Sequence, residues 1–131
     1  MLECLILGDS IGVGVSQVRT ECVSHAVQGY TSKQWNNKFI TNNLTAKCVI
    51  ISLGSNDHKA IKTRKELETL RELVKADRVF WILPAIKPDI QEIVKEVAKE
   101  NGDTVLPILH LEKDNVHPTR AGYKELANAT K

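Results

Sequence analysis

The chain has 131 residues and lacks the features that mark several large classes of protein. No apolar run approaches the roughly 20 residues that a membrane-spanning helix needs. The net charge is only +2, and basic residues alternate with acidic ones instead of forming a block. Neither a nucleic acid nor a membrane surface is therefore expected as a partner.

A signal-peptide layout is also absent, because Glu3 stands where such a peptide has Lys or Arg. Cysteine is scarce, and the three cysteines, Cys4, Cys22 and Cys48, show no C-x-x-C spacing. Cys4 and Cys48 lie in apolar, strand-like runs and are interpreted as buried, reduced thiols. The expected location is the cytoplasm, or a virion if the chain is phage-encoded.

Motifs for metals and nucleotides are missing as well. No pair of cysteines or histidines has the spacing of zinc ligands, so neither a metal nor a cofactor is expected. The Gly-Val-Gly at 12–14 is followed by Gln17, where a dinucleotide fingerprint has Gly or Ala, and no Gly-Lys-Ser/Thr phosphate loop occurs. The Gly-x-Ser-x-Gly elbow of α/β-hydrolases is absent too.

The sequence does contain a regular alternation of apolar runs and helical patterns, without repeats or linkers. Strands are expected at 2–7, 22–27, 48–53, 78–83 and 104–109, the last of them interrupted by Pro107. Such alternation predicts a parallel sheet covered on both faces. We therefore expect one domain over residues 1–131, an α/β protein with three α/β/α layers and about five parallel strands.

Helix ends are marked by turn and capping residues. Thr63 and Glu66 have the spacing of a capping box, and either Thr31 or Ser32 suits the start of an earlier helix. Pro88 suits the first turn of a helix that closes at Asn101-Gly102. A last helix is expected after Pro118.

Polar residues suited to acyl transfer follow these strands. Ser10 comes after the first strand, Gly29 after the second and Asn56 after the third, while Asp114 and His117 follow the last. The carboxyl ends of parallel strands share one edge of a sheet, where sites form. We therefore expect these residues to meet in one site.

The residue types fit a serine nucleophile and its support. Ser10 needs a base, which His117 can supply while Asp114 orients the imidazole. The side-chain amide of Asn56 and the backbone amides of Gly29 and Ser10 suit an oxyanion. The alternatives are a helix cap at Asp9 or Ser10, a turn glycine at Gly29, and an Asp-turn beside an incidental His117.

The remaining histidines and the aromatic residues divide into candidates for the same site and structural residues. His58 is the rival base, whereas His25 and His110 are interpreted as structural. Tyr30 and Trp35, close to Gly29 in sequence, are candidate substrate contacts. Trp81 lies in an expected strand and Tyr123 on an apolar helix face, so both are expected in the core.

The combination resembles the SGNH hydrolases, also called GDSL-type esterases. The matching segments are Gly8-Asp9-Ser10-Ile11, Gly29, Gly54-Ser55-Asn56-Asp57 and Asp114-Asn115-Val116-His117-Pro118. Two departures are Ile11 in place of the usual Leu, and Gln28 before Gly29 in a block where Asn is frequent. The resemblance implies a flavodoxin-like sheet of order 2-1-3-4-5, a Ser10–His117–Asp114 triad, oxyanion donors from Ser10, Gly29 and Asn56, and catalysis without a metal.

The activity expected from this resemblance is hydrolysis of an ester through an acyl-enzyme. Because the chain is shorter than most of the family, we expect an open site and a short acyl group, such as acetyl, on a carbohydrate. Alternatives within the family are a lipase, a thioesterase, or transfer of the acyl group to another alcohol. Outside it, the chain could be a non-catalytic module of a larger phage or envelope assembly.

Overall fold

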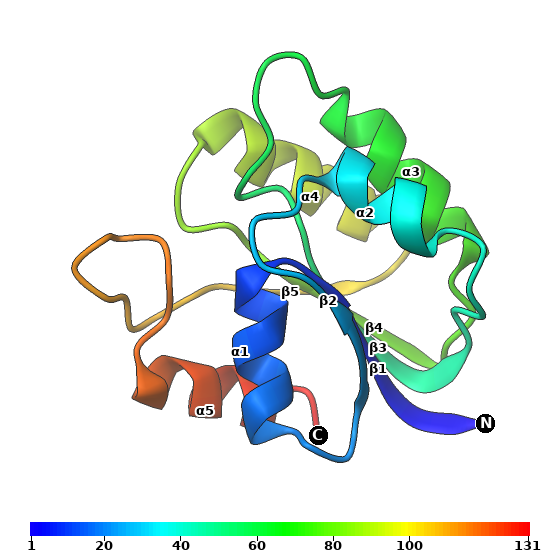
Figure 1. The fold of residues 1–131 in the computed structure, drawn as a ribbon, viewed down its shortest axis with the longest axis horizontal. Helices are drawn as coiled ribbons and strands as arrows, with labels where there is room; N and C mark the ends of the chain where they lie inside the picture. The colour runs from blue at the N-terminus through cyan, green and yellow to red at the C-terminus, as the bar shows by residue number, and fades with distance from the viewer.

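A parallel five-stranded sheet runs through the centre of the protein in the order β2-β1-β3-β4-β5, in a computed structural model that describes residues 1–131 (Figure 1). The strands are β1 (Leu2–Gly8), β2 (Val23–Ala26), β3 (Ala46–Ser52), β4 (Arg78–Ile82) and β5 (Thr104–Leu106). The helices are α1 (Ser10–Val18), α2 (Ser32–Phe39), α3 (Thr63–Leu73), α4 (Pro88–Glu100) and α5 (Arg120–Ala129). The predicted fold class and strand order are confirmed.

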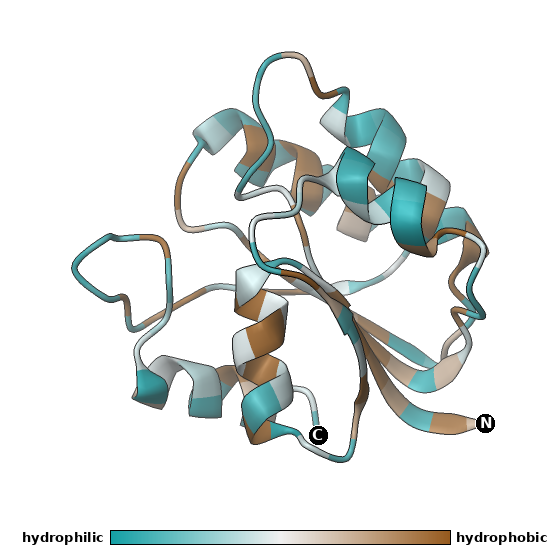
Figure 2. Cartoon of the chain, in the orientation of Figure 1, coloured by the Kyte–Doolittle hydropathy of each residue, from teal (hydrophilic) through white to brown (hydrophobic).

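Helices cover both faces of the sheet, α1 and α5 on one and α2, α3 and α4 on the other (Figure 1). The alternation of side chains along β1 explains the two cores, because successive residues of a strand point to opposite faces. Leu5 and Leu7 belong to the cluster beneath α2, α3 and α4, whereas Cys4 and Ile6 belong to the one beneath α1 and α5. Figure 2 shows apolar residues along the strands of the sheet and largely polar residues along α2 and α3.

Two of the expected helix starts are confirmed. Thr31 caps α2 and forms a capping box with Gln34, and Pro88 is the first residue of α4. The capping box at Thr63 is wrong: Lys62 precedes α3 without a side-chain cap, and the Thr63 hydroxyl donates to the Asp57 carboxylate instead. A charged acceptor outside the helix therefore replaces the local partner.

The interpretation of Cys4 as a reduced thiol is also wrong. Cys4 and Cys22 form a disulfide, with their Cα atoms 4.8 Å apart. Cys48, opposite Cys4 on the neighbouring strand, is the buried free thiol, and burial raises its pKa. The cytoplasm, a reducing compartment, was expected partly because the cysteines were interpreted as reduced thiols. The disulfide removes that reason.

None of the helices combines the length and the apolar character that a bilayer crossing requires.

Candidate active site

The first residue of α1 is Ser10, held at the end of β1 by the residue before it. The backbone N–H of Asp9 donates to the carbonyl of Ser52 on β3 at 3.0 Å. The Asp9 carboxylate caps the helix by accepting from the N–H of Ile11, also at 3.0 Å. Ser10 therefore sits at the positive end of a helix dipole, where negative charge is stabilised.

The side chains of Ser10, His117 and Asp114 form a continuous relay. Ser10 Oγ lies 2.8 Å from His117 Nε2, and His117 Nδ1 lies 2.6 Å from Asp114 Oδ2. In this arrangement Nδ1 carries the imidazole hydrogen and Nε2 is free to accept one from the serine. The structure thus brings together residues that are 107 positions apart in sequence.

The Asp114 carboxylate is fixed by its own turn. Its Oδ1 accepts from the backbone N–H groups of His117 at 3.0 Å and Val116 at 2.9 Å. The backbone bond from His117, then the side-chain bond from His117, lower the pKa of Asp114 to about 2. Asp114 is therefore ionised wherever the protein is handled near neutral pH, although its side chain is 48% exposed.

Asn56 lies in a tight loop after β3 that begins at Gly54, whose φ of +114° suits glycine. Asn56 Nδ2 donates to the carbonyl of Tyr30 at 3.0 Å. Because a carboxamide NH₂ carries two hydrogens, the second remains for another acceptor. This bond also joins the loop after β3 to the loop after β2.

Gly29 lies in that second loop with a φ of +80°, and no atom lies within 4 Å of the place where a Cβ would stand. The position therefore needs glycine for its backbone conformation and leaves the chain open on one side. Both properties suit a backbone that is approached closely by a ligand.

Asp57 shapes the Asn56 loop. Its carboxylate accepts from the backbone N–H of Ser32 at 2.8 Å, from the Ser32 hydroxyl at 2.6 Å and from the Thr63 hydroxyl at 2.7 Å. These bonds tie the loop to the first residues of α2 and α3. With its acceptor oxygens occupied and its side chain buried, Asp57 is a structural residue.

The remaining histidines form other contacts. His58 is exposed, and its Nδ1 accepts from the N–H of Ala60 at 3.3 Å. His110 pairs with Glu125 at 3.2 Å. His25 stacks on Phe39, and partial burial lowers its pKa. His117 is thus the histidine that the structure places on Ser10.

Tyr30 and Trp35 were expected to contact the substrate, and for Trp35 this expectation is wrong. It is 0% exposed, lies in the core beneath α2, and donates its indole N–H to the carbonyl of His25 at 2.8 Å. Proximity to Gly29 in sequence is misleading here, because the apolar face of α2 turns Trp35 toward the sheet. Tyr30 is half-buried and lines a shallow surface hollow.

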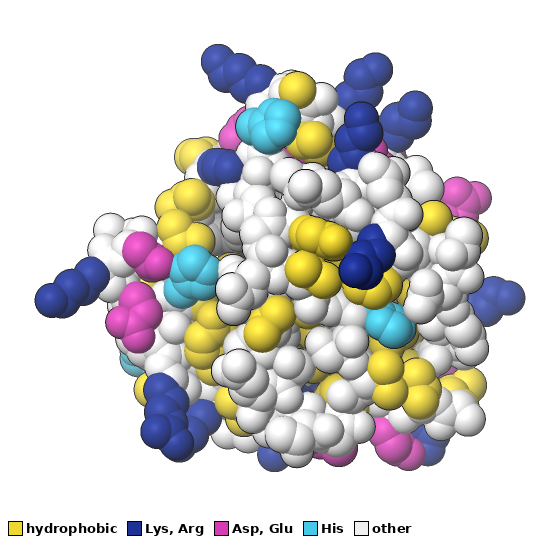
Figure 3. All heavy atoms as spheres, viewed as in Figure 1, with side chains coloured by type: hydrophobic (Ala, Val, Ile, Leu, Met, Phe, Trp, Pro, Cys, Tyr) yellow, Lys and Arg dark blue, Asp and Glu magenta, His cyan; other side chains and the backbone are white.

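Lys87 was missed by sequence reasoning. Its ammonium group contacts the Asn56 loop from the start of α4. A lysine before a proline gives no signal of such a contact, which depends on where β4 and β3 end in space. On the face of the molecule shown in Figure 3, most Lys and Arg side chains lie around the periphery and form no single basic patch.

Two solved structures share this fold. A proposed acylhydrolase from Bacteroides fragilis is 20% identical, with a TM-score of 0.69 over 97% of this chain and 83% of its own. The C-terminal catalytic domain of Streptococcus pneumoniae peptidoglycan O-acetyltransferase A, solved as a methylsulfonyl adduct, is 17% identical, with a TM-score of 0.63 over 96% of this chain and 88% of its own. At these identities the likeness establishes the fold. No family model and no curated protein sequence matches the chain.

Proposed function

We propose that the protein is a serine esterase of the SGNH type that hydrolyses a short acyl ester, most simply an acetyl ester on a carbohydrate. The observation that carries the proposal is the relay from Ser10 Oγ through His117 to Asp114, with distances of 2.8 Å and 2.6 Å. Hydrogen bonds in this order activate a serine for attack on a carbonyl carbon.

In the first half of the reaction, Ser10 Oγ bonds to the acyl carbon while its proton passes to His117 Nε2. The carbonyl oxygen becomes an oxyanion, which accepts hydrogen bonds from the backbone N–H groups of Ser10 and Gly29 and from Asn56 Nδ2. Collapse of this intermediate breaks the bond to the alcohol oxygen. The alcohol leaves with the proton held on His117, and the acyl group stays on Ser10.

In the second half, water attacks the acyl carbon and gives a proton to His117. The bond to Ser10 Oγ breaks, the same proton returns to that oxygen, and the free acid leaves. Asp114 stays ionised throughout and stabilises the imidazolium that forms in each half. No metal or cofactor takes part in these steps.

The substrate class is supported by the exposure of the relay. The His117 and Asp114 side chains are 40% and 48% exposed, so the site is open and suits an ester on the surface of a larger molecule. A short acyl group needs no deep channel in such a site. That one structural neighbour is a peptidoglycan O-acetyltransferase is consistent with acyl chemistry on a carbohydrate.

The test is hydrolysis of p-nitrophenyl acetate by the wild type and by Ser10→Ala. We expect the substitution to reduce kcat by at least ~10³-fold, because the nucleophile is lost. A fluorophosphonate should label the wild type once, at Ser10, as read by mass spectrometry of peptides.

Ser16→Ala is the matched control, since Ser16 lies on the same helix and its hydroxyl donates to the Val13 carbonyl, outside the relay. It should retain both activity and labelling. Equal rates for the wild type and Ser10→Ala would reject the mechanism. A wild type that neither turns over ester nor takes the label would favour a non-catalytic module.

A further inference from the structure

Lys87 lies in an unfavourable backbone conformation at the start of α4. Its φ is +64°, in the left-handed region that disfavours residues with a Cβ, and Pro88 follows as the first helical residue. Non-glycine residues keep such a conformation where surrounding contacts demand it. The contacts of the Lys87 side chain are therefore informative.

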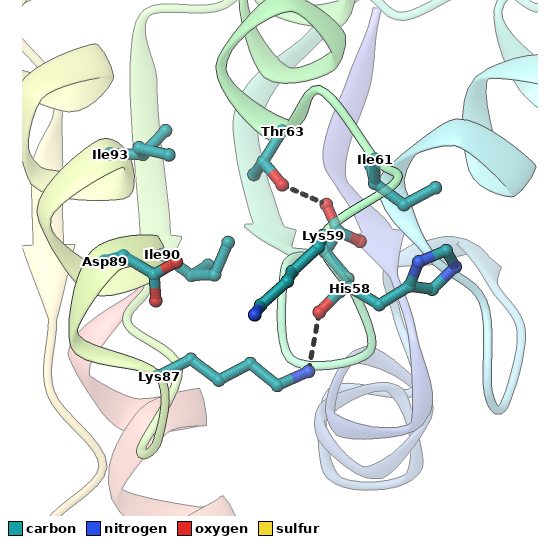
Figure 4. A pocket seen from close by; sticks show the side chains of 9 residues that line it. His58, Lys59, Ile61, Thr63, Lys87, Asp89, Ile90 and Ile93 are labelled. Carbon is teal, nitrogen blue, oxygen red and sulfur yellow. Dashed lines mark hydrogen bonds between the residues drawn. The ribbon is translucent and has the colours of Figure 1, made fainter.

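The Lys87 ammonium group binds the loop that carries Asn56. Nζ donates to the carbonyl of Ser55 at 2.8 Å and to the carbonyl of Asp57 at 2.7 Å. Figure 4 shows the side chain reaching from α4 toward this loop. Hydrogen bonds from a charged donor are stronger than those between neutral groups. Lys87 thus holds the carbonyls of the two residues that flank Asn56 in sequence, Ser55 and Asp57.

A second contact from α4 supports the beginning of the same loop. Ile90 packs against Gly54 so closely that a Cβ on the glycine would lie 2.8 Å from Ile90 Cγ2. The Asn56 side chain itself makes one hydrogen bond, to the carbonyl of Tyr30. Its direction therefore depends on the backbone of the loop. Lys87 holds the peptide group before Asn56 through the Ser55 carbonyl, and the peptide group after Asn56 is held by the N–H of Asp57, which donates to the Gly54 carbonyl at 3.0 Å.

We infer that Lys87 is a positioning residue that holds Asn56 in the orientation required of an oxyanion donor. The inference rests on the proposed function of Asn56. Lys87 is not assigned a contact with the substrate, and it acts through the loop. Since misplacing a reacting or stabilising group by about 1 Å can cost ~10²-fold in rate, loss of these bonds should affect catalysis.

The first test compares Lys87→Met, which keeps an apolar stem but removes the donors, with Lys87→Arg, which restores them. For p-nitrophenyl acetate we expect Lys87→Met to lower kcat by ~10- to 100-fold with little change in KM, because the donor acts on the transition state. Lys87→Arg should recover part of this loss. Lys59 and Lys87 line one pocket together with Asp57 and Ile90 (Figure 4). Lys59→Met is therefore the matched control, since Lys59 is exposed, and it should behave as the wild type.

The second test combines Lys87→Met with Asn56→Ala in a double-mutant cycle. If Lys87 acts through Asn56, the lysine substitution should cause little further loss once the amide is gone. A purely structural role would lower the rate by the same factor in both backgrounds. Such additive losses, or an unchanged kcat in Lys87→Met, would overturn the inference.

The third test does not depend on turnover. In a ¹⁵N-labelled protein, Lys87→Met should shift or broaden the side-chain amide signals of Asn56. The signals of Asn36, whose amide donates to Glu66 at 3.0 Å and 2.9 Å, should stay in place. If the wild type shows no esterase activity, the proposed function fails while these spectra still decide the role of Lys87. Unshifted Asn56 signals would then refute it.

Discussion

The Asp9 carboxyl group, directly before Ser10, is fully buried. Its Oδ1 accepts from the N–H of Ile11 and from the Ser52 hydroxyl, whereas Oδ2 has no hydrogen-bond partner. Burial is the largest influence and raises the pKa of Asp9 to about 6. The folded protein therefore binds a proton at Asp9 more tightly than the unfolded chain does.

This shift predicts a pH-dependent contribution to stability. The contribution of Asp9 is greatest below its unfolded pKa of 3.8 and is lost as the pH rises through about 6, since the buried group must then become charged. Asp9→Asn keeps the shape and the acceptor oxygen but cannot ionise. Between about pH 4 and pH 7, the free energy of unfolding of the wild type should fall relative to the variant, by up to ~3 kcal/mol.

Urea unfolding of both proteins at a series of pH values measures this difference. The other titrating groups are common to the two proteins and cancel in the subtraction. A difference that stays constant with pH, or that grows in favour of the wild type as the pH rises, would contradict the prediction.

Among the elements, β1 and β3 approach each other closely at Gly8, which pairs with Ser52. A Cβ on Gly8 would lie 2.5 Å from the carbonyl oxygen of Ser52, the same oxygen that accepts from the N–H of Asp9. The clash is with backbone, which cannot rotate away as a side chain can. Gly8→Ala is therefore expected to destabilise the protein by about 1–3 kcal/mol.

Gly12→Ala offers a comparison on the neighbouring helix. Its Cβ would lie 3.2 Å from the methyl group of Ala26, and alanine is favoured over glycine in a helix. In urea unfolding, Gly12→Ala should therefore cost less stability than Gly8→Ala. The reverse order would show that the β1–β3 approach is more adaptable than the structure indicates.

The order and type of the elements could be predicted from apolar patterns, but only some of their ends could. β3 begins at Ala46, two residues before the apolar run at 48–53, because Ala46 pairs with Leu2 across the sheet. β5 ends at Leu106, directly before Pro107, as a residue without an N–H requires. At Thr63 the local capping pattern was overridden by Asp57, whose proximity arises only in the folded chain.

At the scale of the whole molecule, the edge shared by the carboxyl ends of the strands explains how residues distant in sequence come together. The residues placed after the strands lie at that edge, and Ser10, His117 and Asp114 are joined there by hydrogen bonds. Contacts between elements could not be predicted from the sequence pattern alone. The disulfide needs β1 beside β2, and Trp35 is directed inward by the packing of α2. Lys87 reaches the carbonyls of Ser55 and Asp57 from the start of α4.

The disulfide predicts a large effect on stability. The double variant Cys4→Ala/Cys22→Ala removes a cross-link between residues separated by 18 positions and should lose about 3 kcal/mol in urea unfolding. Cys48→Ala leaves the cross-link intact and is the matched control.

Alkylation of the denatured protein, followed by mass spectrometry, checks the pairing directly. Without a reductant one cysteine, Cys48, should react, and with a reductant all three should react. Reaction of three cysteines without a reductant would show that the thiols are free.

The position of the Cys4–Cys22 disulfide distinguishes Ser10 from the other two residues of the relay, His117 and Asp114. Cys4 precedes α1 and Cys22 follows it, so Ser10 belongs to a covalently closed ring. His117 and Asp114 lie outside the ring, on the segment before α5, and no cross-link holds them beside Ser10; hydrogen bonds do so. Partial unfolding from the C-terminal end would therefore separate His117 from Ser10 while the ring around Ser10 stays closed.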